Sequence, residues 1–140
     1  MSSRPDQGPT GGVTPHLAIA DRRAGEAIDW YKRAFGAQEM VRMPADDGER
    51  LMHAHLVVNG GSLMLADEFP EYHGRTMGAP EGVTLHLQVD DADRWFARAL
   101  EAGAEATMPV SDMFWGDRYG QLRDPFGHRW SIGSPSKGET

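Results

Sequence analysis

The chain carries one short segment twice, and this internal repeat constrains its fold more than any other feature. Residues 13–20 read Val-Thr-Pro-His-Leu-Ala-Ile-Ala and residues 83–90 read Val-Thr-Leu-His-Leu-Gln-Val-Asp, with His16 and His86 at the same place in each. Downstream, two pairs of glycines keep a common spacing of 67 residues: Gly36 with Gly103, and Gly60 with Gly127. A period of half the chain length indicates a duplicated unit. We therefore expect two tandem modules and look for function between them.

The composition limits the chemistry that such a chain can perform. With 140 residues it can bury roughly two-thirds of its unfolded surface. It has no cysteine, which excludes disulfides, thiolate metal ligands and a cysteine nucleophile. The formal net charge is −7, from 14 basic and 21 acidic residues without a Lys/Arg cluster. Nucleic acid is therefore not an expected partner, and we assign the negative charge mainly to solubility.

The first twelve residues are polar and lack an apolar run. We expect residues 1–12 to form a disordered leader rather than a signal peptide. No later segment approaches the roughly 18 apolar residues that span a bilayer, so we expect no membrane partner. For a chain without cysteine we take a cytoplasmic location as the default.

The first half predicts the element order βαβββ. Residues 13–20 form a short strand, and Asp21 is placed to cap a helix that Gly36 ends. That helix has an apolar stripe at spacings of three and four residues: Ala24, Ala27, Ile28, Tyr31 and Phe35. Three more strands are expected at residues 38–43, 51–59 and 62–67. The last two should form a hairpin around Gly60-Gly61.

The second half repeats this order after a linker that is rich in Pro and Gly. The linker, residues 69–82, is predicted to be loop throughout. Asp91 should cap a helix that Gly103 terminates. The apolar stripe of this helix consists of Trp95, Phe96, Ala99 and Leu100. Strands are expected at residues 104–110, 119–123 and 129–132. The segment Asp124-Pro125-Phe126-Gly127 predicts a turn rather than a catalytic motif.

These elements predict an α+β fold: two tandem βαβββ modules that form curved mixed sheets around a cavity. The first module should span residues 13–68 and the second 83–133, followed by a tail at 134–140. Side chains alternate between the two faces of a strand. Four should therefore pack against a helix: Leu17, Ile19, Leu87 and Val89. Four should face the cavity: His16, Ala18, His86 and Gln88.

Several segments resemble a known superfamily once they are combined with this repeat. They are Ala27-Ile28-Asp29-Trp30-Tyr31 with Phe35-Gly36-Ala37, Met52-His53-Ala54-His55-Leu56, Phe114-Trp115-Gly116-Asp117-Arg118-Tyr119-Gly120, and Asp124-Pro125-Phe126-Gly127-His128-Arg129-Trp130. Together they resemble the vicinal oxygen chelate superfamily of glyoxalase I, extradiol dioxygenases, fosfomycin-resistance enzymes and bleomycin-binding proteins, and most closely its PhnB-like branch. The resemblance covers residues 13–133. Because one scaffold hosts both enzymes and binding proteins, it implies the fold more strongly than a reaction.

The resemblance also implies where a metal ion would lie. Metal-dependent members use the first-strand position of each half and a glutamate in each half's last strand. The first pair falls on His16 and His86, which suit zinc, nickel, manganese or iron, whereas the second pair falls on Met64 and Ser131, which do not. Two interpretations stay open: the two histidines hold a divalent metal, or they face the cavity without one.

Other side chains are candidates for ligand binding. His53 and His55 lie two apart on a strand and share one face, which makes them ligand-binding candidates and, in a metal-free enzyme, acid/base candidates. The Trp115, Arg118 and Tyr119 loop can stack on or clamp a ligand. Strand parity and the register of the repeat give three further ligand-binding candidates: Met64, Gln88 and Ser131. We expect His73 and His128 to be structural or exposed, and Trp95 and Trp130 to pack in the core.

Three functions follow from these candidates. The first is a small-molecule-binding protein that holds its ligand in the sheet cavity, with a degenerate metal site. The second is a metal-dependent lyase, isomerase or dioxygenase of the glyoxalase type that uses His16 and His86. The third is a metal-free enzyme with His53 or His55 as acid/base. In each case an exposed sheet edge favours a homodimer.

Overall fold

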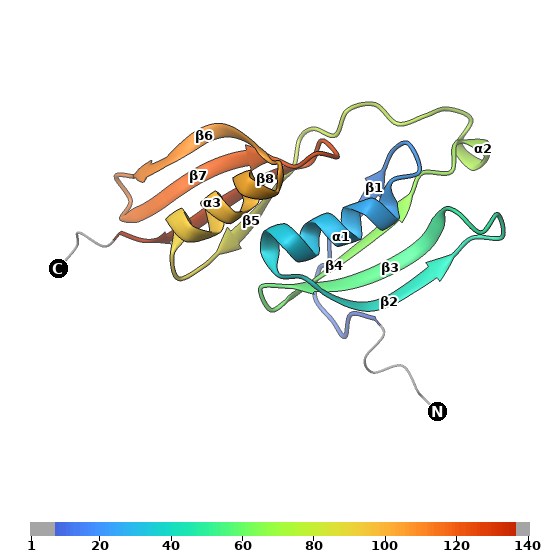
Figure 1. Cartoon of the computed structure of the whole chain (residues 1–140), viewed down its shortest axis with the longest axis horizontal. Coiled ribbons are helices and arrows are strands. Elements are labelled where there is room, and N and C mark those ends of the chain that lie inside the picture. The colour runs from blue at the N-terminus through green and yellow to red at the C-terminus, as the bar shows by residue number, and fades with distance from the viewer. Residues whose placement is uncertain (1–7, 137–140) are drawn as a thin grey trace. The chain divides into compact units, whose positions relative to one another are not determined.

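The computed structural model, which describes residues 8–136, contains two modules with the element order βαβββ (Figure 1). The four strands of each module form one mixed sheet. This confirms the α+β class and the duplicated module. Its contacts divide the chain into two units that change over after Gly78, except that Arg33–Phe35 at the end of the first long helix group with the second unit. Each unit is described by itself. None of the helices in the described range is long and apolar enough to cross a lipid bilayer.

The first module contains one long helix and four strands. They are β1 (His16–Ile19), α1 (Ala24–Phe35), β2 (Gln38–Pro44), β3 (Leu51–Val58) and β4 (Gly61–Asp67). The strands lie in the order β1-β4-β3-β2, with β1 parallel to β4 and the other pairs antiparallel. Leu17 and Ile19 are buried on one face, as predicted, whereas His16 and Ala18 are exposed on the other.

The N-terminus of α1 is completed by a distant residue rather than by the predicted local cap. Asp67, at the end of β4, accepts the backbone N–H of Ala24 at 2.9 Å and that of Leu51 at 2.7 Å. The prediction that Asp21 caps this helix is wrong, because Asp21 and Arg22 both adopt positive φ and turn the chain before the helix begins. The predicted stop at Gly36 is confirmed by its left-handed conformation, φ 69°.

The hairpin between β3 and β4 uses a different pair of turn residues from the predicted one. Asn59 (φ 50°) and Gly60 (φ 84°) occupy the two-residue turn, while Gly61 already belongs to β4 and pairs with Val58. Positive φ at both turn positions is the geometry that Asn-Gly favours.

The linker contains a short helix, α2 (Pro70–His73), so the prediction of loop throughout is wrong. Proline at the first position supplies a backbone already suited to a helix, and Gly74 ends it with φ 80° and an N–H bond to the carbonyl of Pro70. A single turn of this kind has no apolar periodicity by which sequence reasoning recognises a helix.

The second module repeats the first. Its elements are β5 (Thr84–Gln88), α3 (Ala92–Ala102), β6 (Glu105–Asp112), β7 (Asp117–Arg123) and β8 (Arg129–Pro135), with strand order β5-β8-β7-β6. The predicted cap is confirmed, since Asp91 accepts the N–H of Arg94 at 3.2 Å. Ser134, on the last strand, accepts the N–H of Ala92 at 2.9 Å and so takes the part that Asp67 has in the first module.

The turn before β8 is confirmed, whereas the predicted stripe of α3 is confirmed only for Phe96 and Ala99 and is wrong for Leu100. Asp124 accepts the N–H of Gly127 through its carbonyl at 3.0 Å, and its carboxylate accepts the indole N–H of the buried Trp130 at 2.9 Å. On α3, Phe96 and Ala99 are buried, Trp95 is half-buried, and Leu100 is 37% exposed.

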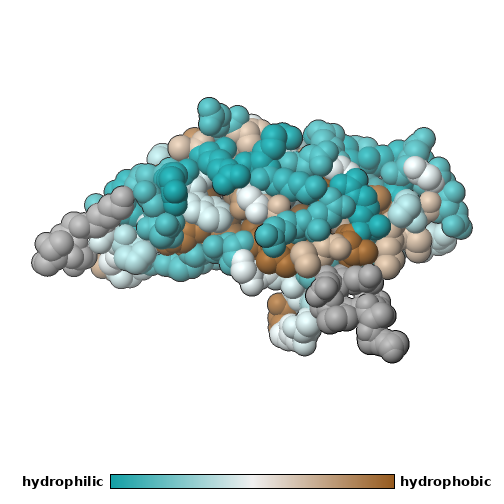
Figure 2. Space-filling view, turned by 60° about the horizontal axis from the view of Figure 1, so that its bottom comes forward, coloured by the Kyte–Doolittle hydropathy of each residue, from teal (hydrophilic) through white to brown (hydrophobic). Residues whose placement is uncertain are grey.

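Hydrophilic residues cover much of the face shown in Figure 2, with apolar residues reaching that surface in patches.

Candidate functional site

The open face of the second sheet, meaning the face opposite α3, carries a row of polar side chains. In the strand register His86 lies opposite Ser131, and Ser131 lies opposite Gln121. The Nδ1 atom of His86 is 2.7 Å from Ser131 Oγ, and its Nε2 atom is 2.8 Å from Gln88 Oε1. An amide oxygen only accepts, so Nε2 carries the ring proton and Nδ1 accepts from the serine hydroxyl. Both ring nitrogens of His86 are therefore engaged.

An aromatic ledge lies beside this polar row. The Tyr119 ring stacks on the His86 ring, with centroids 5.9 Å apart and planes 23° apart, and its hydroxyl accepts from Gln121 Nε2 at 3.1 Å. Trp115, 51% exposed, meets Tyr119 edge-on at 5.6 Å. Gln121 is not among the ligand-binding residues predicted from the sequence. Its position two residues after Tyr119 on one strand was the available signal.

A glycine makes the His86–Gln88 contact possible. Gly133 pairs with both Gln88 and Tyr119 across the sheet. A Cβ atom built on it would lie 3.1 Å from His86 Cε1 and 3.4 Å from Gln88 Oε1. Because these separations are tight, a side chain at this position would push the imidazole and the amide away from their present contact.

Arg118 is not brought together with the other predicted ligand-binding residues. Its guanidinium donates to Asp93 on α3 at 2.8 and 3.0 Å and to Asp112 at 3.1 Å. These hydrogen bonds, chiefly those to Asp93, raise the pKa of Arg118. Arg118 and Tyr119 are neighbours on a strand and so face opposite ways. Gly120, by contrast with Tyr119, lies under the helix, where an added Cβ would be 3.0 Å from the Phe96 ring.

The open face of the first sheet brings together three predicted residues. His16 lies opposite Met64, and Met64 lies opposite His55, so the three form one row. His55 is only 3% exposed, and its Nε2 atom is 2.9 Å from Ser62 Oγ. His53 precedes His55 by two residues on β3 and is half-buried. In this register His55 corresponds to Gln121 of the second module.

The register also tests whether these residues fit a divalent metal. It confirms that Met64 and Ser131 stand beside His16 and His86, at the positions where the resemblance implies glutamates. A thioether and a hydroxyl are poor ligands for such ions. Between Gly8 and Ser136 no group of three or more His, Asp or Glu residues is arranged to hold an ion. The residues present do not fit a metal centre of this kind.

The acidic residues near the end of β4 are already engaged. Asp67 is buried and holds the start of α1, as described above. Glu68 Oε2 accepts the backbone N–H of Met77 at 2.9 Å and so fastens the linker to the strand end. Neither carboxylate is therefore placed to replace the glutamate ligand that the resemblance implies at position 64.

Comparison with known proteins places this geometry among related chains. The family model described as the Glyoxalase/Bleomycin resistance protein/Dioxygenase superfamily matches residues 14–132. An uncharacterized protein of Mycobacterium tuberculosis H37Rv is 46% identical over 128 residues, which covers 88% of this chain and 74% of that protein.

Two solved structures have the same fold. Protein PA1353 from Pseudomonas aeruginosa is 27% identical with a TM-score of 0.72, covering 90% of this chain and 98% of that one. A PhnB protein from Bacillus cereus, described as a putative 3-demethylubiquinone-9 3-methyltransferase, is 21% identical with a TM-score of 0.69, covering 89% and 99%. The second likeness concerns the fold alone.

Proposed function

Because the chain belongs to the glyoxalase/bleomycin resistance protein/dioxygenase superfamily, we propose that it binds a small organic molecule without a metal ion. The ligand's planar part stacks on Trp115 and Tyr119, and its neutral polar groups bond to Gln121, Gln88 and Ser131. This is a binding function, with the open face of the second sheet as its principal surface.

The chemistry of that face supports a ligand with neutral polar groups. The row around His86 and the two rings beside it present amides, hydroxyls, an imidazole and aromatic surface, while Arg118 is turned to the helix side and paired with Asp93. Arg129 and the Arg123–Glu105 pair, which are charged side chains of this face, lie beyond that row, at the start of β8 and the end of β7. A charged group placed on such a surface without a counter-charge pays a desolvation penalty of several kcal/mol. Exposed aromatic rings with amide donors nearby instead suit a planar, polar molecule.

One observation carries the choice against a metal-dependent enzyme: His86 uses both ring nitrogens in hydrogen bonds to Ser131 and Gln88. To ligate an ion, the imidazole would have to give up one of these bonds. Catalytic zinc sites normally have three protein ligands. The metal-dependent lyase or dioxygenase is therefore the weaker candidate.

The test begins with a thermal-shift screen of planar heterocyclic compounds against the wild-type chain, followed by calorimetry on each hit. Trp115→Ala should weaken binding of a hit by about 1 to 3 kcal/mol, because it removes the stacking surface. Tyr72→Ala, which removes an exposed ring from the first module, is the control and should leave affinity unchanged.

Two results would contradict the proposal. One is unchanged affinity in both Trp115→Ala and Tyr119→Ala. The other is about one ion retained per chain after equilibration with zinc, nickel, manganese or ferrous iron and dialysis. We also propose that the chain is a homodimer, which sedimentation equilibrium would test directly.

A further inference from the structure

We propose that a pocket on the open face of the first sheet binds the oxyanion of a small organic molecule, a carboxylate or a phosphate, with Arg75 as its principal anchor. The site uses residues of the first module and the linker, so it shares no residue with the surface assigned above to the planar ligand.

The pocket exists because two facing side chains are short. Ala18 lies opposite Ala66 in the parallel pair β1 and β4, and above them is a hollow of about 600 Å³. That volume falls within the range of small-molecule sites. The remaining lining comes from β1, the end of β4 and the linker: His16, Leu17, Asp67, Glu68, Phe69, His73, Arg75, Thr76 and Met77.

Arg75 is an exception among the cations of this chain. Its guanidinium has no ion pair or side-chain hydrogen bond with any residue between Gly8 and Ser136. Most other Lys and Arg side chains in that range are ion-paired, as expected where acidic residues outnumber basic ones by 21 to 14. A guanidinium left unpaired at a pocket presents a planar fork of donors that matches carboxylate and phosphate oxygens.

The two acidic residues of the pocket are engaged by backbone groups. Asp67 accepts from Ala24 and Leu51, and Glu68 accepts from Met77. Their charges still reduce the attraction for an anion, so we expect simple anions to bind in the millimolar range. His73 and Thr76 supply further polar groups at the rim, and Phe69 offers an apolar wall to the rest of the ligand.

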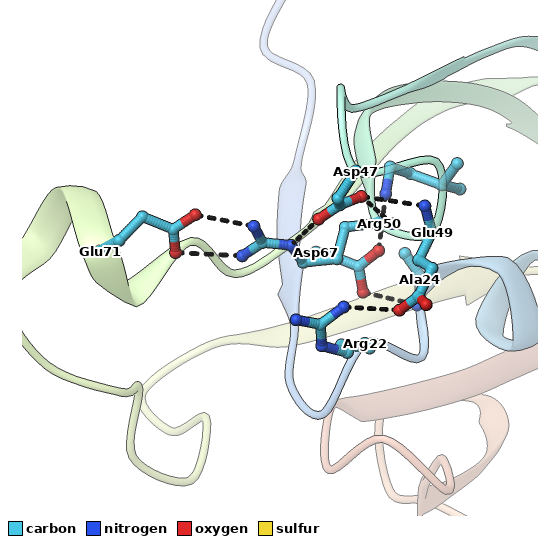
Figure 3. Close-up of polar contacts among 8 residues, drawn as sticks. Arg22, Ala24, Asp47, Glu49, Arg50, Asp67 and Glu71 are labelled. Atoms are coloured by element: carbon cyan, nitrogen blue, oxygen red, sulfur yellow. Dashed lines mark hydrogen bonds and ion pairs between the residues drawn. The ribbon is translucent and has the colours of Figure 1, made fainter.

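The linker that carries Arg75 is held in place before any ligand arrives (Figure 3). Arg50 donates to both carboxylate oxygens of Glu71 on α2, at 3.0 and 2.7 Å, and to Asp47 at 2.7 Å. The same guanidinium lies 4.2 Å from the centroid of the Phe69 ring. These contacts fix α2 against the turn before β3. Such preorganisation lowers the ordering cost of binding.

The experiment is an NMR titration of the ¹⁵N-labelled full chain with inorganic phosphate, acetate and benzoate in separate series. We expect saturable shifts at the amides of residues 73–77. Arg75→Ala should weaken binding about tenfold, and Arg75→Lys should restore only part of it because the forked geometry is lost. Arg129→Ala is the matched control, since Arg129 is also exposed and unpaired in the described range but lies on β8.

A second variant tests the pocket rather than the charge. Ala66→Leu fills the floor of the pocket and should abolish the anion-induced shifts at residues 73–77. The other amide resonances should keep the dispersion of a folded protein. Benzoate binding more tightly than acetate would show that the apolar wall takes part, and phosphate binding more tightly than both would identify a phosphate site. Equal affinity of wild type and Arg75→Ala for all three anions overturns the proposal. Trp115→Ala should not alter anion binding, so a failure of the planar-ligand site is recognised separately.

Discussion

The two modules share a backbone plan but differ on the faces opposite their helices. In the first module the row that follows His16 holds Ala18 and Ala66, whose short side chains leave a pocket. In the second module the equivalent row holds Gln88 and Gly133, and the Gln88 amide contacts His86, two residues before it on the same strand. Two differences in side-chain length, Ala18 against Gln88 and Ala66 against Gly133, thus separate a pocket in one module from a hydrogen-bonded surface at the equivalent place in the other.

The helix-supporting positions changed far less. The last strand of each module presents one oxygen-bearing side chain to the first N–H of that module's helix, from Asp67 in the first and Ser134 in the second. They differ in reach, since Asp67 also holds Leu51 at the start of β3. A carboxylate has two acceptor oxygens for this purpose, while a hydroxyl has one.

The largest expected effect on stability comes from removing the two side chains that support the helices, Asp67 and Ser134. Asp67→Ala leaves two buried N–H groups without their acceptor and should lower the free energy of unfolding by about 3 kcal/mol, whereas Ser134→Ala, which frees one, should lower it by about 1 kcal/mol. Urea denaturation followed by circular dichroism measures both. Equal losses in the two variants would show that the second bond of Asp67 contributes nothing.

The next largest effect on stability concerns Gly133 and Ala66, which occupy equivalent positions in the last strands of the two modules. Gly133→Ala places a Cβ 3.1 Å from His86 Cε1 and should cost about 1 to 2 kcal/mol. It should also shift the ¹⁵N resonances of the His86 ring as the bond to Gln88 breaks. Ala66→Gly, which only loosens a strand, should cost about 0.5 to 1 kcal/mol and leave those resonances in place. An unchanged His86 spectrum in Gly133→Ala would contradict the locking of this ring.

The charged cluster of Lys32, Glu39 and Arg42 in the first module gives a smaller, pH-dependent effect. Hydrogen bonds from Arg42 and then Lys32 lower the pKa of Glu39 to about 2. A carboxyl whose pKa is depressed on folding stabilises the protein above its unfolded pKa, and this contribution is lost as pH falls toward 2. Because Arg42 and Lys32 are more than a third exposed, solvent screening limits it to about 1 kcal/mol.

Glu39→Gln therefore should cost about 1 kcal/mol at pH 7, and the difference from wild type should shrink between pH 4.5 and pH 2. Denaturation curves at several pH values provide the measurement. Ala106→Gln, at an exposed position of β6 in the second module, is the control and should show no such pH dependence. If the difference in free energy of unfolding between wild type and Glu39→Gln grew as the pH fell, the stabilising role assigned to ionised Glu39 would be contradicted.

The smallest effect on global stability should come from releasing the linker. Arg50→Ala removes the bonds to Glu71 and Asp47, so the amides of residues 72–77 should exchange with solvent faster. The turn at residues 124–128, which Asp124 holds through its own hydrogen bonds, should exchange as in wild type. Hydrogen–deuterium exchange measures both segments, and equal protection of the linker with and without Arg50 would refute its anchoring role.

The repeat and the alternation of strand faces predicted much of this fold. The two equivalent histidines, the helix stops at Gly36 and Gly103, and the opposite facing of Leu17 and His16 all follow from local periodicity. Asp67 could not be predicted as the support of α1, because it is 43 residues away from Ala24 and only the folded sheet brings them together. The single turn of α2 lacked a periodic signal.

The candidate site was less predictable for the same physical reason. Parity alone would have separated Arg118 from Tyr119, yet which of the two faces the helix depends on the packing of Phe96 over Gly120. The engagement of His86 by Ser131 and Gln88 depends on strand register and on the room left by Gly133. Local sequence patterns do not predict contacts between residues that lie far apart in the sequence.

The helix supports also set an order of events during synthesis. The oxygen that completes α1 emerges from the ribosome 43 residues after the helix's first N–H, and the one that completes α3 emerges 42 residues after its own. Each helix therefore waits for the final strand of its own module. Once β4 has been translated, the chain contains all four strands of its first sheet and the acceptor for α1, so this sheet can form while the second module is still being translated.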